Sequence, residues 1–195
     1  MTGRPPPSSV TPRTPAAAAA SGHAGRIVDP RGRAKAYRPL APADRDVAVD
    51  RGLAAYARGD FYLAHEELEP AWMGADDSSE RALVGGLIKL AAAFVHAERG
   101  NPLGVRTNLA GALDRLADTA QATARYAGID LPALVQDVRA RLDQAEAYLA
   151  VHGASPSPRP PGDSVPGHDV VGPPSRVRGV RVPIAPPLLP RRARG

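Results

Sequence analysis

The sequence predicts an all-α protein, a single compact bundle of about five mostly antiparallel helices between disordered termini rich in proline and arginine. Apolar residues between positions 44 and 151 recur at helical spacing, and no stretch alternates over the length of a strand. Only Pro70, Pro102 and Pro132, of the 22 prolines, lie between Arg45 and Val151. These observations place a helical domain at 44–151, a usual size for one domain.

Charge divides the chain in the same way. Residues 1–43 carry seven basic residues and one acid, and residues 152–195 carry seven basic residues and two acids. The region between them holds 11 basic and 17 acidic residues, so the domain is acidic although the pI of the chain is about 10.1. The basic tails lack interleaved aromatic residues, and we expect no specific nucleic-acid binding.

The composition also excludes several kinds of site. There is no cysteine, so disulfides, thiolate metal sites and cysteine nucleophiles are absent. The longest apolar stretch, 83–97, is interrupted by Lys89 and His96 and is too short and too polar to span a membrane. We therefore expect a cytoplasmic protein without a membrane span.

The two ends are expected to be disordered, over 1–43 and 152–195, because they offer little apolar surface to bury. Within the first, residues 27–42 differ. They are extended by prolines yet contain Ile27, Tyr37 and Leu40, so they form either an arm that docks on the domain or a solvated linker.

A first helix is expected over 44–57. Gly59 ends it through a left-handed cap, and Asp60 caps a second helix that runs to about Met73. Pro70 should kink or end the last turn of that helix, because its ring removes one backbone donor.

The third helix, 80–99, has the broadest apolar face and is expected to be central, with a stripe of small residues that lets another helix approach closely. This face and stripe contain Leu83, Leu87, Leu90, Phe94, Gly86, Ala93 and Ala97. The fourth helix opens at Asn101-Pro102 and ends before Gly128, and the fifth runs from Asp130 to Gly153.

The turns Arg58-Gly59-Asp60 and Arg99-Gly100-Asn101 are alike, and each joins two helices. They are consistent with two stacked helical hairpins of repeat type. The same residues are also common wherever one helix ends and another begins, so two unrelated turns are the alternative.

Two segments of this region carry a family resemblance. The first is Gly-Asp-Phe-Tyr-Leu-Ala-His-Glu-Glu-Leu-Glu-Pro-Ala-Trp at 59–72. The second is Gly-Leu-Ile-Lys-Leu-Ala-Ala-Ala-Phe-Val-His at 86–96, followed by Arg-Gly-Asn-Pro at 99–102. In this order and separation they resemble the uncharacterised bacterial and archaeal family called domain of unknown function 309. The resemblance covers roughly 49–149 and implies a compact helical bundle with no established activity.

The family pattern maps onto His65, Glu66, Glu69, Trp72, Arg81, Gly86, His96, Gly100 and Asn101. This chain departs from it at Lys89, where relatives usually have glutamine, and at Pro70, where a helix-forming residue is usual. The segment 32–40 is similar to an arm that precedes the domain in some relatives, and this likeness favours docking of the arm.

The second helix holds the candidate catalytic residues His65, Glu66 and Glu69, with His96 as a fourth. His65 and Glu69 are one turn apart, the spacing at which two side chains reach one metal ion, and His96 would be a third ligand. His-Glu-x-x-Glu is also similar to the zinc-protease helix His-Glu-x-x-His, with Glu66 as general base. The competing interpretation is a structural, half-buried His65 held by Glu69 or by the third helix, and it predicts no bound metal.

Candidate binding residues are Trp72, Arg81 and Lys89, although Trp72 as the only tryptophan also suits the core. No complete catalytic motif is present. The leading hypothesis is therefore a non-enzymatic module that binds a partner protein or peptide, without a cofactor. The alternative is a metal- or acid/base-dependent enzyme centred on the His-Glu-x-x-Glu helix. The partner and the oligomeric state stay open.

Overall fold

The computed structural model describes residues 26–28, 34–36, 38–154 and 181–189. The predictions of disorder for the rest of the two termini lie outside the described residues. No helix in the described part of the chain is long and apolar enough to cross a membrane.

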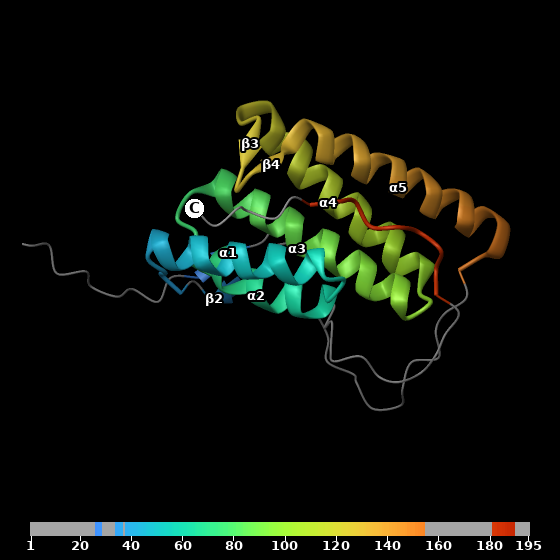
Figure 1. The fold of residues 1–195 in the computed structure, drawn as a ribbon, viewed down its shortest axis with the longest axis horizontal. Helices are drawn as coiled ribbons and strands as arrows, with labels where there is room; N and C mark the ends of the chain where they lie inside the picture. The colour runs from blue at the N-terminus through green and yellow to red at the C-terminus, as the bar shows by residue number, and fades with distance from the viewer. Residues whose placement is uncertain (1–25, 29–33, 37, 155–180, 190–195) are drawn as a thin grey trace, which may run out of the picture.

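The described chain is helical, as predicted. The helices are α1 (Pro42–Ala57), α2 (Phe61–Gly74), α3 (Ser78–Glu98), α4 (Pro102–Ala122) and α5 (Leu131–His152) (Figure 1). Their order agrees with the sequence patterns, and most of their ends do so to within about two residues. The exception is α4, which was predicted to continue up to Gly128 but ends at Ala122, because a short hairpin occupies the residues before α5.

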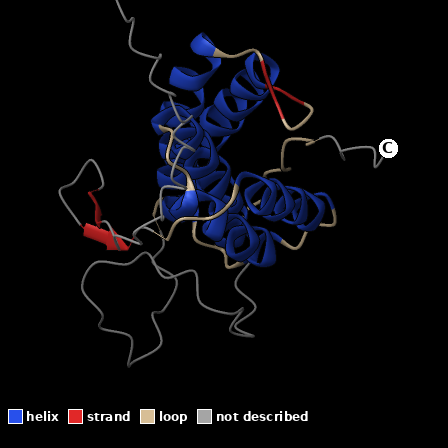
Figure 2. Ribbon diagram, turned by 90° about the vertical axis from the view of Figure 1, so that its left-hand side faces the viewer, coloured by secondary structure: helices blue, strands red, loops and turns tan. Residues whose placement is uncertain are grey.

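Two short antiparallel strand pairs accompany the helices and were not predicted. Strands β1 (Arg26–Val28) and β2 (Ala34–Ala36) form a pair that stands apart from the helices in Figure 2. Strands β3 (Arg125–Tyr126) and β4 (Ile129–Asp130) join α4 to α5. Two or three residues are too few to show alternation in the sequence. Ala127 and Gly128, at the turn between β3 and β4, both have positive φ, as type I′ hairpin turns require.

Four of the helices begin at a short polar side chain that caps them. Asp60 accepts a hydrogen bond from the Leu63 N–H at 3.1 Å, and Asn101 accepts one from the Gly104 N–H at 2.8 Å. Asp77 and Asp130 do the same at the starts of α3 and α5. Because these bonds join residues three apart, the sequence locates the starts of α2 to α5, whereas α1 begins at Pro42 without a side-chain cap.

Pro70 does not end α2, which continues to Gly74. The ring lies on the exposed side of the helix, where solvent can reach the carbonyl that loses its partner. Of the two effects predicted for Pro70, a kink or an end of the helix, the end is therefore not found.

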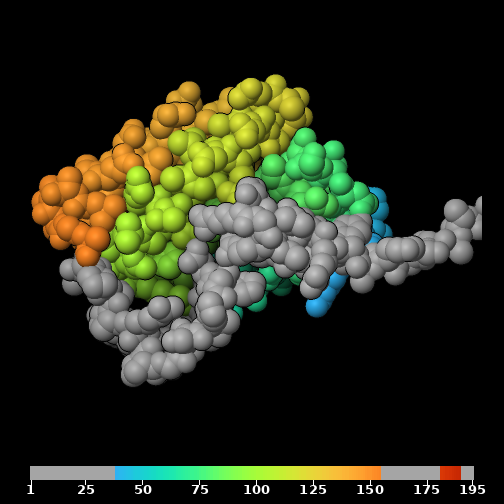
Figure 3. Space-filling view, turned by 180° about the vertical axis from the view of Figure 1, so that it is seen from behind, coloured from blue at the N-terminus to red at the C-terminus, as the bar shows by residue number. Residues whose placement is uncertain are grey.

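Helices that are neighbours in the chain pack on one another and run antiparallel (Figure 1). α3 lies between α2 and α4 and is the central helix, as predicted, with Phe94 and Leu87 fully buried. Gly86 allows α4 to approach, because a Cβ there would lie 2.8 Å from Leu116. From behind, α4 and α5 lie side by side along one edge of the molecule (Figure 3).

Part of the predicted arm lies on the bundle. The Arg38 N–H donates to the Met73 carbonyl at 3.2 Å, and the Leu40 carbonyl accepts from Arg45 at 2.8 Å. Gly74 leaves room for the chain at Leu40, whose Cβ occupies the place that a side chain at Gly74 would take. Residues 38–40 are thus held against the end of α2.

Residues 181–189, called the C-terminal segment below, depart from the expected disordered tail. They run along the bundle between α1 and α5 without helix or strand (Figure 1). Val182, Ile184 and Leu189 are buried and belong to the same hydrophobic core as the helices. The segment can dock because it carries no charge after Arg181, unlike the arginine-rich residues around it.

Candidate functional site

The first candidate site is the group of ligand atoms on α2. One atom each from His65, Glu66 and Glu69 lie within 4.8 Å of one another. His65 is half-buried, and its Nδ1 lies 3.2 Å from Glu66 Oε1. The structural interpretation of His65 predicts that Glu69 or the third helix holds its ring. The structure instead pairs His65 with the next residue in the chain, because a glutamate side chain is long enough to turn back along the helix.

His96 lies elsewhere. It is near the end of α3, where its Nδ1 is 3.2 Å from Asn101 Nδ2 and its ring fills the space beside Gly104. The described residues within ligand distance of His65 are Glu66 and Glu69, so His96 does not complete a metal site with them. Its place is the α3–α4 turn.

The three predicted binding residues are in contact with neighbouring elements. The Trp72 indole nitrogen lies 3.1 Å from the position of a Cβ on Gly85, so Trp72 packs across α3. Arg81 donates to the Ala75 carbonyl in the α2–α3 connection. Lys89 donates to Asn108 Oδ1 on α4 at 3.1 Å. The structure gives each of these side chains a place in the packing of α2, α3 and α4.

The second candidate site, which the sequence did not indicate, is the surface under the C-terminal segment. We call this the docking surface; its residues come from the end of α1, the α1–α2 turn, the end of α3 and from α5. The residues used below are Tyr56, Phe61, Ala97 and Arg141. Three aromatic rings meet beneath it, with Phe61 5.2 Å from Tyr56 and 5.3 Å from Phe94 between centroids.

The C-terminal segment presents alternate residues to the bundle. Its first half buries Val182 and Ile184 and exposes Pro183 and Ala185. Its second half buries Pro187 and Leu189 and exposes Leu188. Every second residue is buried within each half, but the buried set shifts by one residue between Ile184 and Pro187, so the segment is not one regular extended strand.

Two hydrogen bonds to its backbone fix the position of the segment. The Val182 N–H donates to the Ala97 carbonyl at 3.0 Å, and the Ala185 carbonyl accepts from Arg141 Nε at 3.3 Å. Asp137 holds the same Arg141 at 3.1 Å. A donor and an acceptor at two separated points define both the register and the direction of a bound chain.

A tight turn shapes the first half of the segment. The Ile184 N–H donates to the Val182 carbonyl at 2.8 Å, which closes a three-residue turn around Pro183. The φ angle of an inverse γ-turn is close to the angle that a proline ring imposes, so Pro183 favours this shape. The turn brings Val182 and Ile184 to the bundle together.

Opposite charges on Arg181 and Glu98 favour docking at the beginning of the segment. Partial burial raises the pKa of Glu98 at the end of α3, and the positive charge of Arg181 opposes that rise. Arg181 therefore lies near a carboxylate of the bundle and attracts it, although both side chains are exposed to solvent.

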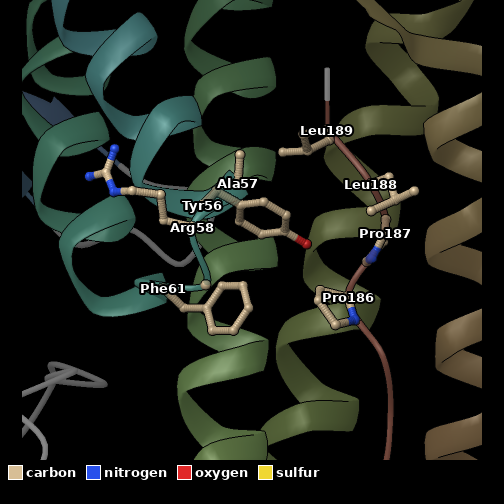
Figure 4. A pocket seen from close by; sticks show the side chains of 9 residues that line it. Tyr56, Ala57, Arg58, Phe61, Pro186, Pro187, Leu188 and Leu189 are labelled. Atoms are coloured by element: carbon tan, nitrogen blue, oxygen red, sulfur yellow. The ribbon is translucent and has the colours of Figure 1, made fainter. Parts of the chain in front are cut away.

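The second half of the segment leaves space against the bundle. A hollow of about 460 Å³ lies between Pro186–Leu189 and the corner formed by Tyr56, Phe61 and the α1–α2 turn (Figure 4). Arg58 borders this hollow but extends its guanidinium away from the segment (Figure 4). The lining close to the prolines is thus mainly apolar.

Tyr56 has a buried hydroxyl at this hollow. The side chain points its oxygen toward Pro186 and Pro187 (Figure 4), and within the described part of the chain that oxygen has no hydrogen-bond partner. Burial raises the pKa of Tyr56, the positive charge of Arg141 acts in the opposite direction, and the charge of Asp137 raises it further. The phenol is therefore a neutral donor at ordinary pH.

One signal in the sequence could have found this site. Residues 182–190 form the longest uncharged stretch of the C-terminal region and contain Val182, Ile184, Leu188 and Leu189. The composition of the whole tail, in which glycine, proline and arginine dominate, masks this stretch and predicts disorder.

Comparison with known proteins bears out the resemblance seen in the two motifs. The family model described as domain of unknown function (DUF309) matches residues 49–108. The chain matches no curated protein and no solved structure. The matched range includes Tyr56, Phe61 and Ala97 of the docking surface, whereas Arg141 and the C-terminal segment lie beyond it.

Proposed function

We propose that this chain, whose residues 49–108 carry the domain described as DUF309, is a non-enzymatic peptide-binding module. Its ligand is an extended, proline-containing apolar peptide that lies between α1 and α5. The observation that carries the proposal is the C-terminal segment, which occupies this surface in the structure.

The segment is held in the manner of a bound peptide. It has no helix or strand of its own, it buries every second side chain within each half, and hydrogen bonds between its backbone and Ala97 and Arg141 fix its register. Prolines restrict the free chain to extended conformations, so docking costs less conformational entropy than it would for an ordinary peptide. The five helices, in contrast, pack on one another without the segment.

The arrangement of helices supports the same proposal. Contacts to the segment come mainly from alternate helices, namely Tyr56 on α1, Ala97 on α3 and Arg141 on α5. Stacked helical hairpins commonly present an extended surface of this kind, on which peptides bind lengthwise.

The test uses the full chain and a blocked, labelled peptide of sequence 181–189. An Ile184→Asp substitution in the protein releases its own segment, because a carboxylate cannot occupy a buried apolar position without a partner. We expect this variant to bind the peptide at least about tenfold more tightly than the wild-type chain does, since the wild-type surface is occupied.

Matched controls make the test specific. A Leu188→Asp protein should behave as wild type, because Leu188 is exposed, and an Ile184→Asp peptide should not bind. Hydrogen exchange at the Val182 amide reports whether the protein's own segment has been released. If that amide exchanges freely, the helices remain folded and the peptide still fails to bind, the proposal is wrong.

A second candidate function rests on the three ligand atoms of His65, Glu66 and Glu69 within 4.8 Å. One imidazole and two carboxylates can bind a divalent transition-metal ion and leave positions for water, as hydrolytic metal sites do. The test is a Zn²⁺ titration of the full chain by calorimetry. One equivalent that His65→Ala abolishes and His96→Ala retains would support the enzyme; no uptake by the wild type would exclude this site for Zn²⁺.

A further inference from the structure

The C-terminal segment fits its docking surface unevenly. Its first half is closely held, with Val182 and Ile184 buried and a hydrogen bond to Ala97. Its second half leaves the hollow of about 460 Å³ beside Pro186 and Pro187. If the segment is one occupant of a peptide site, as the proposed function holds, the quality of its fit indicates what a better occupant must contain.

The Tyr56 hydroxyl identifies the missing group. Tyr56 is 5% exposed, and the docked segment gives its hydroxyl no hydrogen-bond acceptor among the described residues. The Ala185 carbonyl, one residue before Pro186, is instead bonded to Arg141. A buried donor without an acceptor weakens a complex, because the hydroxyl loses its bond to water and gains nothing in exchange.

We propose that residues 181–189 are a replaceable occupant, and that the preferred ligand is a partner protein's extended peptide with a neutral hydrogen-bond acceptor side chain at the position of Pro186. This peptide keeps the Val-Pro-Ile half, which the bundle already fits. Its amide side chain, of glutamine type, enters the hollow and accepts a hydrogen bond from Tyr56. The proposal rests on the proposed function and adds the chemistry of the ligand.

A neutral amide suits the site better than a carboxylate. The hollow is lined by apolar atoms near the prolines, and burying a carboxylate there would cost far more than burying an amide. The nearest charges are also balanced, since Asp137 is paired with Arg141. Arg58 turns its guanidinium away from the segment, so it offers no partner in this position (Figure 4).

The experiment compares three blocked peptides of sequence 181–189: the native one, a Pro186→Gln peptide and a Pro186→Leu peptide. Leucine is similar to glutamine in size and restores the same N–H, but it has no acceptor. Each peptide is titrated into the full chain carrying Ile184→Asp, with and without Tyr56→Phe. We expect Pro186→Gln to bind about tenfold more tightly than Pro186→Leu when Tyr56 is present, and equally when it is phenylalanine.

The outcomes separate this inference from the proposed function. If the native peptide does not bind the released protein, the peptide-binding module itself is refuted, and the preferred ligand with it. Two other results concern the case in which the native peptide binds: the glutamine and leucine peptides have equal affinities, or their difference in affinity persists in Tyr56→Phe. Either result overturns only the assignment of Tyr56 as the group that recognises the amide.

Discussion

Leu188 and Leu189 are consecutive residues in opposite environments. The Leu188 side chain is 92% exposed, whereas that of Leu189 is 8% exposed and joins the core of the bundle. Both residues are leucines near the end of the described chain, and neither lies in a helix or strand. The pair therefore provides an internal control for the docking of the C-terminal segment.

Truncating Leu189 to alanine should destabilise the protein, and truncating Leu188 should not. Truncation of a buried apolar side chain costs about 1–3 kcal/mol. The cost at Leu189 cannot exceed the free energy of docking, because the segment would otherwise detach from the bundle. Urea unfolding of the two full-length variants measures this difference. Equal midpoints for Leu188→Ala and Leu189→Ala would mean that the segment does not dock in solution.

Two glycines on facing helices should respond to alanine with opposite signs. A Cβ at Gly86 would lie 2.8 Å from Leu116, which is buried and has little room to move. At Gly111 the nearest atoms are 3.5 Å away, at the end of the flexible Arg115 side chain. We expect Gly86→Ala to destabilise by about 1–3 kcal/mol and Gly111→Ala to stabilise by up to about 1 kcal/mol. Thermal melts of both variants test the close approach of α3 and α4.

Phe94 should be among the most costly residues to truncate. It is fully buried on the central helix, with the rings of Phe61 and Tyr56 at 5.3 and 6.3 Å between centroids. Replacing it by alanine removes these contacts and leaves a cavity, for about 3–5 kcal/mol. Leu103→Ala, at a half-exposed position on α4, is the control. A loss below about 1 kcal/mol for Phe94→Ala would show that the aromatic cluster is not the core.

The free energy of unfolding should decrease in alkaline solution because Tyr56 is buried. Burial raises its pKa in the folded protein, so above about pH 10 the unfolded chain loses this proton while the folded protein retains it. The stabilising contribution is complete below the unfolded pKa and is lost as the pH rises further, by about 1.4 kcal/mol per pH unit. Tyr56→Phe should flatten this dependence relative to wild type. Urea unfolding between pH 8 and 11 measures it, and parallel curves for the two proteins would contradict the burial of Tyr56.

The helices could be predicted from the sequence because their ends depend on local chemistry. Asp60, Asn101 and Asp130 each bond an amide three residues away, and the positive φ of Gly59 and Gly100 requires only the residue itself. All the residues that determine such a helix end lie within a few positions of one another in the sequence. The family resemblance rested on something different, namely the order and separation of the two motifs along the chain.

The docking surface could not be predicted in this way. It joins Tyr56, Ala97 and Arg141, which are far apart in sequence, to a segment whose prolines give no periodicity. The His65–Glu66 pair was missed for a different reason. Helical geometry separates the faces of adjacent residues, but it does not restrain the outer bonds of a glutamate side chain. The functional roles of His65, Glu66, Glu69, Trp72, Arg81, Lys89 and His96 stay predictions.

The C-terminal segment follows all five helices in the chain, and this order has a consequence during synthesis. Domains generally begin to fold from the N-terminal side while translation continues, so the helices can pack before residues 181–189 have been made. We expect the newly formed bundle to expose Tyr56 and Phe61 until the segment has left the ribosome and docked. We expect a partner that meets the protein at this stage to find the surface vacant, whereas one that arrives once the segment has docked must displace Val182 and Ile184 first.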